Sequence, residues 1–281
     1  RLRMLASSYI LAQYMKLEHF VIWEPKNDCF VKFDSIWKQH PFQTIELETI
    51  TKSKYIYFGL VHTKTVMDRI LNSGDVDYIV LTGGHEFKHP AMNTDEYLHH
   101  KYKLYSALQF TRVQIELPSQ YACVHIRNIT PTDMNDVKKY DSCKFIDNSP
   151  IYQFMVMVKK INDNVPLVII SNDNVVAKVF QDQFPQKNIY LSRPESFDRD
   201  SQNGMKCAIQ DFSIMTKALF IVGTYYSSFS DEASFFNMIP KIIPLAEHIT
   251  SPIYHCSGYT VVNGVGYLNY DRNTNIKYLM H

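Results

Sequence analysis

The chain has 281 residues, of which 46% are hydrophobic and 20% are charged, and its formal net charge is +1. This composition is typical of a globular protein with one large domain or two smaller ones. The small net charge excludes a broad electrostatic attraction to nucleic acid or to an anionic membrane, and leaves room only for a local basic pocket. No apolar run reaches about 18 residues, which excludes a transmembrane helix within this sequence.

Cysteine usage bears on metal binding and on the compartment. None of the cysteines has the CxxC spacing of a zinc site. Their odd number and scatter favour reduced, buried thiols, so we expect a reducing compartment and a cytoplasmic protein. Because the sequence starts at Arg1 and not at Met, we expect residues upstream of it, and N-terminal targeting stays open. The cysteines are Cys29, Cys123, Cys143, Cys207 and Cys256.

The first part of the chain mixes helical and strand patterns. Apolar residues recur at helical spacing over residues 2–13, which predicts an opening helix. Short apolar runs predict strands at 20–23, 55–60 and 77–81, the last ended by a pair of glycines. A longer helix is predicted over about 95–113.

From residue 120 onward strands and helices alternate regularly. The strand runs are apolar throughout, which is typical of a parallel sheet covered by helices on both faces. We place a domain boundary near 114–120, with Pro118 and Ser119 as the hinge. The predicted strands are 121–126, 167–170, 189–191, 220–222 and 242–243, and the predicted helices are 151–161, 175–184, 204–219 and 230–238.

Polar residues follow several of these strands, where ligands bind in open α/β sheets. His125 and Arg127, two side chains able to carry positive charge, close the strand 121–126. A serine-rich turn precedes the helix 230–238, and such a turn offers hydroxyls, backbone N–H groups and the positive end of a helix dipole. With the guanidinium fork of Arg127, this set predicts a diphosphate site. Asp173 or Asp211 would accept hydrogen bonds from a ribose or a base.

Each of these residues also has a structural explanation. Ser230 is a natural helix N-cap, and residues 171–173 would cap the helix that follows them. Arg127 taken alone suits a surface ion pair, and His125 alone suits a core position. The diphosphate hypothesis therefore depends on the convergence of three features on one edge of the sheet.

These stretches, in this order, resemble the fucosyltransferase-type glycosyltransferases of the GT-B class. That family has a strand ending in HxRR, then a strand with a Ser/Thr-Asp motif, then an Asp-led helix, a strand and a Ser-Ser-Phe-Ser turn. The opening Arg1-Leu2-Arg3 is similar to the end of the family's GxGN-x-LR turn. The matching stretches are His125-Ile126-Arg127-Asn128, Ser171-Asn172-Asp173, Asp211 to Met215, Ile221 to Thr224, and Ser227-Ser228-Phe229-Ser230.

The resemblance implies an α/β protein with two Rossmann-like domains facing a central cleft. Residues 1–118 would form the acceptor-side domain, 119–249 the nucleotide-sugar-binding domain, and 250–281 a tail packing back toward the first. The implied reaction is inverting and needs no metal or bound cofactor, with a nucleotide sugar and a glycan or glycoprotein as substrates. The implied donor-binding residues are Arg1, Arg3, His125, Arg127, Asn172, Asp173, Asp211, Ser227, Ser228 and Phe229.

The catalytic groups follow from what the reaction needs. Arg127 would stabilise the leaving diphosphate, and a carboxylate or histidine would deprotonate the acceptor hydroxyl. Glu86 and Asp133 are the favoured candidates for this base. Asp75-Val76-Asp77 has the DxD spacing of metal-dependent glycosyltransferases, but Asp77 opens a predicted strand instead of ending one, which disfavours a metal role and leaves either aspartate as a further candidate for the base. The remaining candidates for the base are Glu24, His85 and Asp136.

One departure from the family pattern keeps the donor open. The second arginine of HxRR is Asn128 here, and the family uses the arginine pair around GDP-fucose. A viral member, such as an algal-virus xylosyltransferase acting on UDP-xylose in the host cytoplasm, is therefore an alternative. A second alternative is a sugar- or nucleotide-binding protein without catalysis. A Rossmann-type oxidoreductase is disfavoured because no GxGxxG follows a predicted strand.

Overall fold

A computed structural model describes residues 2–24, 31–59, 68, 70–72, 74–83, 86–111, 116–127, 149–192, 195–196, 198, 201–225 and 227–246, together with the backbone of 259–262 and 265–268. The chain divides into two compact units, Arg1–Thr111 and Arg112–His281. Within the described residues, no helix combines the length and the apolar character that a membrane span requires.

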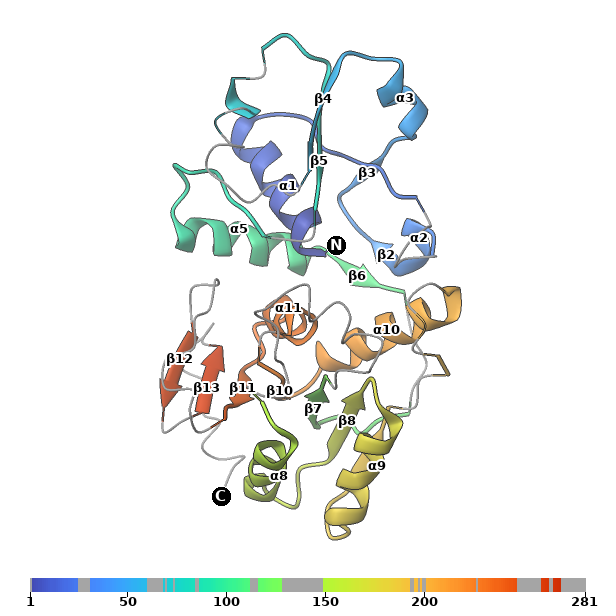
Figure 1. The fold of residues 1–281 in the computed structure, drawn as a ribbon, viewed down its shortest axis with the longest axis vertical. Coiled ribbons are helices and arrows are strands. Elements are labelled where there is room, and N and C mark those ends of the chain that lie inside the picture. Colours follow the sequence, from blue (N-terminus) through green and yellow to red (C-terminus); the bar gives the residue numbers. More distant parts are fainter. Residues whose placement is uncertain are drawn as a thin grey trace. The chain divides into compact units, whose positions relative to one another are not determined.

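Among its described residues, the first unit has two longer helices, α1 and α5, two short ones, α2 and α3, and three pairs of strands (Figure 1). β1 and β3 are parallel, as are β4 and β5, whereas β2 and β6 are antiparallel. Met4 and Leu11 of the first helix pack against Phe58, Ile70 and Phe87 in one apolar cluster. The elements are α1 (Leu2–Met15), β1 (Phe20–Val21), α2 (Phe33–Ile36), β2 (Trp37–Gln39), β3 (Gln43–Thr44), α3 (Leu47–Thr51), β4 (Tyr55–Gly59), β5 (Tyr78–Thr82), α5 (Thr94–Ser106) and β6 (Gln109–Phe110).

Two of the predicted elements of this unit differ from the structure. The predicted strand 20–23 is shortened to the two residues of β1, and the predicted helix 95–113 ends at Ser106. Asn93 caps this helix, because its side chain accepts a hydrogen bond from the backbone N–H of Glu96 at 2.8 Å. Beyond the helix, Phe110 lies in β6 and stacks on Trp37 of β2 with 4.6 Å between the ring centroids. Pairing with a distant strand thus overrides the helical pattern.

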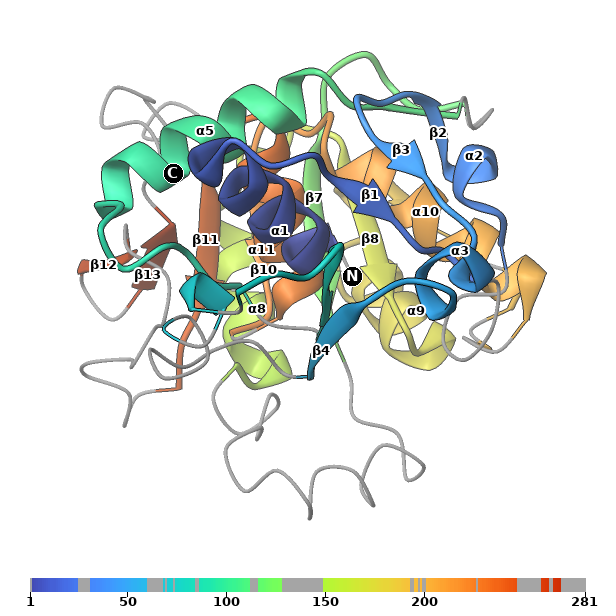
Figure 2. The same ribbon diagram turned by 90° about the horizontal axis from the view of Figure 1, so that it is seen from above.

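The second unit contains a seven-stranded sheet in the order β12-β13-β11-β10-β7-β8-β9 (Figure 2). The five strands β7 to β11 are mutually parallel, and β13 and β12 extend the sheet as an antiparallel hairpin. This hairpin, within the predicted tail 250–281, lies on the sheet of the second unit. The strands are β7 (Ala122–Ile126), β8 (Leu167–Ser171), β9 (Ile189–Leu191), β10 (Ile221–Gly223), β11 (Lys241–Pro244), β12 (Tyr259–Val262) and β13 (Val265–Leu268).

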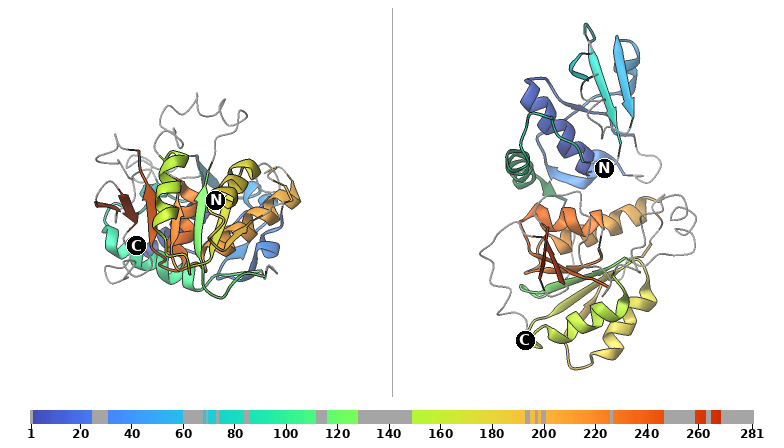
Figure 3. Two further views of the ribbon diagram at one scale, coloured as in Figure 1. Left: turned by 90° about the horizontal axis from the view of Figure 1, so that it is seen from below. Right: turned by 60° about the vertical axis from the view of Figure 1, so that its left-hand side comes forward.

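Helices cover both faces of this sheet, as the fully apolar strands predict. Figure 3 shows α8 and α9, in yellow-green and yellow, on one side and α10 and α11, in orange, on the other. All five residues of β8 are buried, which confirms that neither face of this strand meets solvent. The helices are α8 (Ile151–Lys160), α9 (Asn174–Gln183), α10 (Gln202–Met215) and α11 (Ser228–Phe236).

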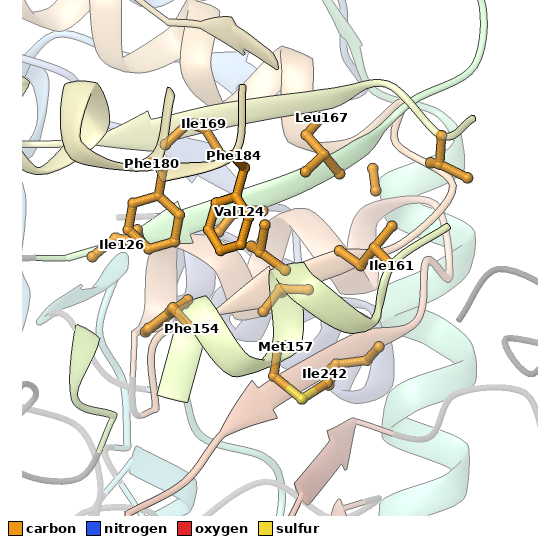
Figure 4. Packing of buried hydrophobic residues seen from close by; sticks show 14 of the residues in the cluster. Val124, Ile126, Phe154, Met157, Ile161, Leu167, Ile169, Phe180, Phe184 and Ile242 are labelled. Carbon is orange, nitrogen blue, oxygen red and sulfur yellow. The ribbon is translucent and has the colours of Figure 1, made fainter. Parts of the chain in front are cut away.

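The larger apolar core lies between the sheet and the helices α8 and α9. Val124 and Ile126 of β7 point into it, together with Phe154 of α8 and Phe180 of α9 (Figure 4). Alternation along β7 sends the intervening His125 to the opposite face, beneath α11. The face covered by α10 and α11 is therefore the one that carries polar side chains.

Candidate functional site

The strand order of the second unit marks one end of the parallel strands as a candidate ligand site. Numbered by position in the chain, the five parallel strands lie in the order 3-2-1-4-5, so the direction of winding reverses between β7 and β10. In open α/β sheets, ligands bind outside the carboxyl ends of the strands at such a switch point. Arg127 follows β7 there, and residues 224–227 follow β10. We call residues 224–227 the switch turn.

Thr224 joins the two strands at the switch point. Its hydroxyl accepts a hydrogen bond from the backbone N–H of Arg127 at 2.8 Å and donates to the carbonyl of His125 at 3.1 Å. Its own N–H donates to the same carbonyl at 3.1 Å. A hydroxyl at this position therefore closes the gap where β7 and β10 diverge, and fixes the backbone from which the Arg127 side chain projects.

The switch turn leads directly into the N-terminus of α11. Ser227 occupies the N-cap position, yet its side chain makes no capping hydrogen bond. Its hydroxyl oxygen is fully buried and has no hydrogen-bond partner in the described part of the chain. The exposed Ser228 comes next, and the first N–H groups of a helix lack partners within it. An anion bound here would satisfy the hydroxyl and meet the positive end of the helix dipole.

His125 contributes shape and hydrogen bonding, and it brings no charge. Burial, together with the positive charges of Lys241 and Arg127, lowers the pKa of its imidazole to about 3. The ring lies against Phe229 of α11, with 5.6 Å between centroids, and its Nδ1 atom has no partner among the described residues. Burial therefore keeps His125 neutral, and its contact with a donor stays a prediction. The positive charges next to this ring are those of Arg127 and Lys241.

Asp211 lies on the same face of the sheet, in α10. Its carboxylate accepts a hydrogen bond from the hydroxyl of Ser192, the residue after β9. Burial raises the pKa of Asp211 to about 6, although the bond from Ser192 acts in the opposite direction. The next residue, Phe212, contacts Phe229 with 5.5 Å between ring centroids, so α10 and α11 pack closely beside the switch turn. Asp211 is buried, with 8% of its surface exposed.

Asp173 caps the helix that follows it, which was the structural alternative to ribose binding. It is the N-cap of α9, where its Oδ1 atom accepts hydrogen bonds from the N–H of Val175 at 2.9 Å and of Val176 at 3.4 Å. Its own N–H donates to the hydroxyl of Ser171 at 3.1 Å. Donor binding by Asn172 and Asp173 stays a prediction.

In the first unit, Glu86 belongs to a buried polar network. Its Oε1 atom accepts hydrogen bonds from the Lys101 ammonium at 2.6 Å and from the Tyr97 hydroxyl at 3.0 Å. The Tyr97 hydroxyl also bonds Ser7, at 2.9 Å. Because the Lys101 side chain is only 3% exposed, its charge requires the carboxylate as a partner. Loss of Glu86 alone would therefore leave a buried charge unpaired and destabilise this unit, whatever the part of Glu86 in a reaction.

The remaining predicted residues divide between described and undescribed parts of the chain. Arg3 lies in α1, Glu24 follows β1, and Phe229 and Ser228 open α11. Asp77 accepts a hydrogen bond from the N–H of Lys54 at 2.9 Å. Among the described residues, no cluster of three or more His, Cys, Asp or Glu side chains could hold a metal ion. Arg1, His85, Asn128, Asp133 and Asp136 lie outside the described residues.

Sequence reasoning missed one charged residue at the switch point, Lys241. Its side chain is fully buried, and its ammonium donates to the carbonyl of Thr224 at 3.0 Å and to Asp231 at 2.6 Å. The available signal was a lone lysine that opens an otherwise apolar strand, a place where a charged side chain needs a partner.

Comparison with known proteins identifies the fold. No protein-family model matches the sequence, and neither does any curated protein. The structure is similar to NodZ α-1,6-fucosyltransferase soaked with GDP-fucose, with a TM-score of 0.52 and 10% identity over 86% of this chain and 89% of that one. It is also similar to fucosyltransferase NodZ from Bradyrhizobium, with a TM-score of 0.52 and 10% identity over 90% and 92% of the two chains. The chain therefore has a mixed α/β fold with parallel sheets that is similar to that of NodZ, and the arrangement of two Rossmann-like domains facing a central cleft stays a prediction.

Proposed function

We propose that the chain is a glycosyltransferase that transfers a sugar from a nucleoside diphosphate to a hydroxyl group of a glycan, with GDP-fucose as donor. One observation carries this proposal: the switch point of the sheet combines the arginine after β7 with a buried hydroxyl, at the N-terminus of α11, that has no hydrogen-bond partner among the described residues. A fold shared with a fucosyltransferase that was soaked with GDP-fucose supports the choice of donor.

In this proposal, the switch point binds the diphosphate and stabilises it as it leaves. The bond between the anomeric carbon and the phosphate oxygen breaks, and negative charge builds on that oxygen. The guanidinium of Arg127 would bind two phosphate oxygens, while Ser227, Ser228 and the first N–H groups of α11 would donate to the others. These groups are positioned before the reaction, so they stabilise the leaving group without reorganising, and we expect no metal requirement.

The acceptor hydroxyl must lose its proton as its oxygen attacks the anomeric carbon from the side opposite the diphosphate, which inverts the configuration. Glu86 and Asp133 remain our candidates for the group that takes this proton. Asp211 is our candidate for contact with the nucleobase, since a carboxylate can accept the paired N1–H and N2–H donors of guanine. Uracil offers only one such donor, which is our chemical reason for preferring GDP to UDP.

Thermal unfolding with GDP, GDP-fucose, UDP and UDP-xylose tests the proposal. A nucleotide at about 100 times its Kd stabilises the folded protein by about 2.7 kcal/mol, which raises the Tm of a unit of this size by roughly 5–10 °C. We expect the guanine compounds to give this shift, Arg127→Ala to abolish it, and Arg127→Lys to restore part of it, since lysine keeps the charge without the fork.

The same panel distinguishes the alternatives. Slow hydrolysis of GDP-fucose without acceptor indicates an enzyme, whereas binding without hydrolysis indicates a protein that only binds the nucleotide. A shift with UDP-xylose alone would replace the donor and keep the site. A shift with none of the four compounds, or an unchanged shift in Arg127→Ala, would overturn the proposal.

A further inference from the structure

The side chain of Lys241 extends from β11 past β10 to the switch turn. This lysine is the first residue of β11, pairs with Ile221 of β10, and has no exposed surface. Its side chain then runs over Gly223, where a Cβ atom would lie 2.6 Å from Cε and 3.3 Å from Nζ of the lysine. Any side chain at this position of β10 would therefore occupy the path of the lysine and displace it.

At the end of this path the ammonium joins two separate elements. It donates to the carbonyl of Thr224, in the switch turn, at 3.0 Å and to Oδ1 of Asp231, in the first turn of α11, at 2.6 Å. The Asp231 side chain is only 4% exposed, so both charges lie in the interior. The backbone of the same region is tied by a hydrogen bond from the N–H of Asp231 to the carbonyl of Ser227 at 3.0 Å.

We infer that the buried Lys241–Asp231 pair is a positioning device that holds the switch turn and the N-terminus of α11 in the geometry that binds the donor's diphosphate. This inference rests on the proposed function and adds two residues to it. A buried ion pair is a poor source of stability, because desolvation of both charges offsets their attraction. Its geometry offers a better reason for its presence, since one cation fixes a turn and a helix that must meet the same ligand.

The pair also keeps the N-terminus of α11 free of an uncompensated negative charge. A carboxylate in the first turn of a helix stands beside the N–H groups that would bind a phosphate, and without a partner it would repel the diphosphate. The ammonium of Lys241 neutralises the charge of the Asp231 carboxylate. Its charge reaches the switch point, since it is one of the causes that depress the pKa of His125.

A double substitution tests the inference without leaving one buried charge unpaired. Lys241→Met with Asp231→Asn removes both charges and keeps the approximate shapes. The control is Lys187→Met with Asp163→Asn, which also removes a buried lysine and its carboxylate partner, although the Asp163 side chain is 61% exposed. Lys187 is also buried, and its ammonium donates to Asp163 and to the carbonyl of Ile161, each at 2.6 Å. This pair lies at the amino ends of β8 and β9, away from the switch point.

Isothermal titration with GDP and UDP, and with guanosine and uridine, gives the readout. We expect the double variant at Lys241 and Asp231 to bind the diphosphate at least about tenfold more weakly, with a smaller loss for the nucleoside, because the pair acts on the phosphates. The control pair should change neither affinity more than about twofold. Amide hydrogen exchange of the unliganded protein should also rise over residues 224–231 in the first variant alone.

The possible failures separate the two claims. If the wild type binds neither GDP nor UDP, the proposed function is overturned, and the inference with it. If the wild type binds one of them, the inference alone is overturned by an unchanged affinity in the first variant. It is also overturned by equal losses in both double variants, or by equal losses for the diphosphate and the nucleoside.

Discussion

Replacement of Ser227 by alanine should improve stability or leave it unchanged, and should weaken nucleotide binding. An N-cap serine normally stabilises its helix by about 1 kcal/mol, but through a side-chain hydrogen bond that Ser227 does not make. Its hydroxyl is instead buried without a partner among the described residues, and such a group costs roughly 1–3 kcal/mol. Removing the hydroxyl therefore removes a penalty, and we expect a Tm that is unchanged or up to about 12 °C higher.

Ligand binding should respond in the opposite direction. If the Ser227 hydroxyl meets a phosphate oxygen, its loss removes a hydrogen bond to a charged group, which is worth about 1.5–3 kcal/mol or roughly 10- to 150-fold in Kd. Ser230→Ala is the matched control, because Ser230 is equally buried in the same helical turn but donates to the carbonyl of Ser227 at 3.3 Å. That substitution should cost about 1 kcal/mol of stability.

Thermal unfolding and titration with GDP measure both effects on the same variants. An unchanged or higher Tm together with weaker GDP binding in Ser227→Ala would show that this hydroxyl serves ligand binding and not the stability of the fold. The reasoning is refuted if Ser227→Ala lowers the Tm as much as Ser230→Ala does. The predicted effect on nucleotide binding is refuted separately if Ser227→Ala leaves the Kd for GDP unchanged.

Two further predictions follow from the same face of the sheet. Gly223→Ala should lower the free energy of unfolding by roughly 1–3 kcal/mol in chemical denaturation and weaken GDP binding, because the new methyl group displaces Lys241. Gly59→Ala is the control and should be tolerated, since its Cβ would meet nothing closer than 3.7 Å. Equal losses of stability at the two glycines would contradict this prediction. Asp211 has a pKa of about 6 in the folded protein and 3.8 unfolded, so the folded state binds the extra proton between these values and stability falls as pH rises through that window. Asp211→Asn should therefore gain about 2–3 kcal/mol relative to the wild type between pH 4 and 7, and a difference that is independent of pH would exclude this cause.

The sheet of the second unit was predictable because its strands are apolar on both faces. Such runs have few alternatives to a buried parallel strand, and β7, β8 and β10 lie where the pattern predicted them. The diphosphate hypothesis used residues that immediately follow these strands, so it depended only on strand ends and on their parallel direction. Those are properties of local sequence.

Properties that arise between distant elements could not be predicted in this way. The neutral state of His125 follows from burial under α11, and the partners of Lys241 come from β10 and α11. A lone lysine before an apolar strand gives no indication that a glycine elsewhere will leave room for it. The same limit applies to the helix ending at Ser106, where the pairing of Phe110 with Trp37 decides the boundary.

A crystal structure of the chain with GDP bound would test the central claim most directly. We predict that the diphosphate lies at the carboxyl ends of β7 and β10, with the Arg127 guanidinium and the Ser227 hydroxyl within hydrogen-bond distance of its oxygens. A nucleotide bound at another edge of the sheet, or one whose phosphates contact neither residue, would contradict the account.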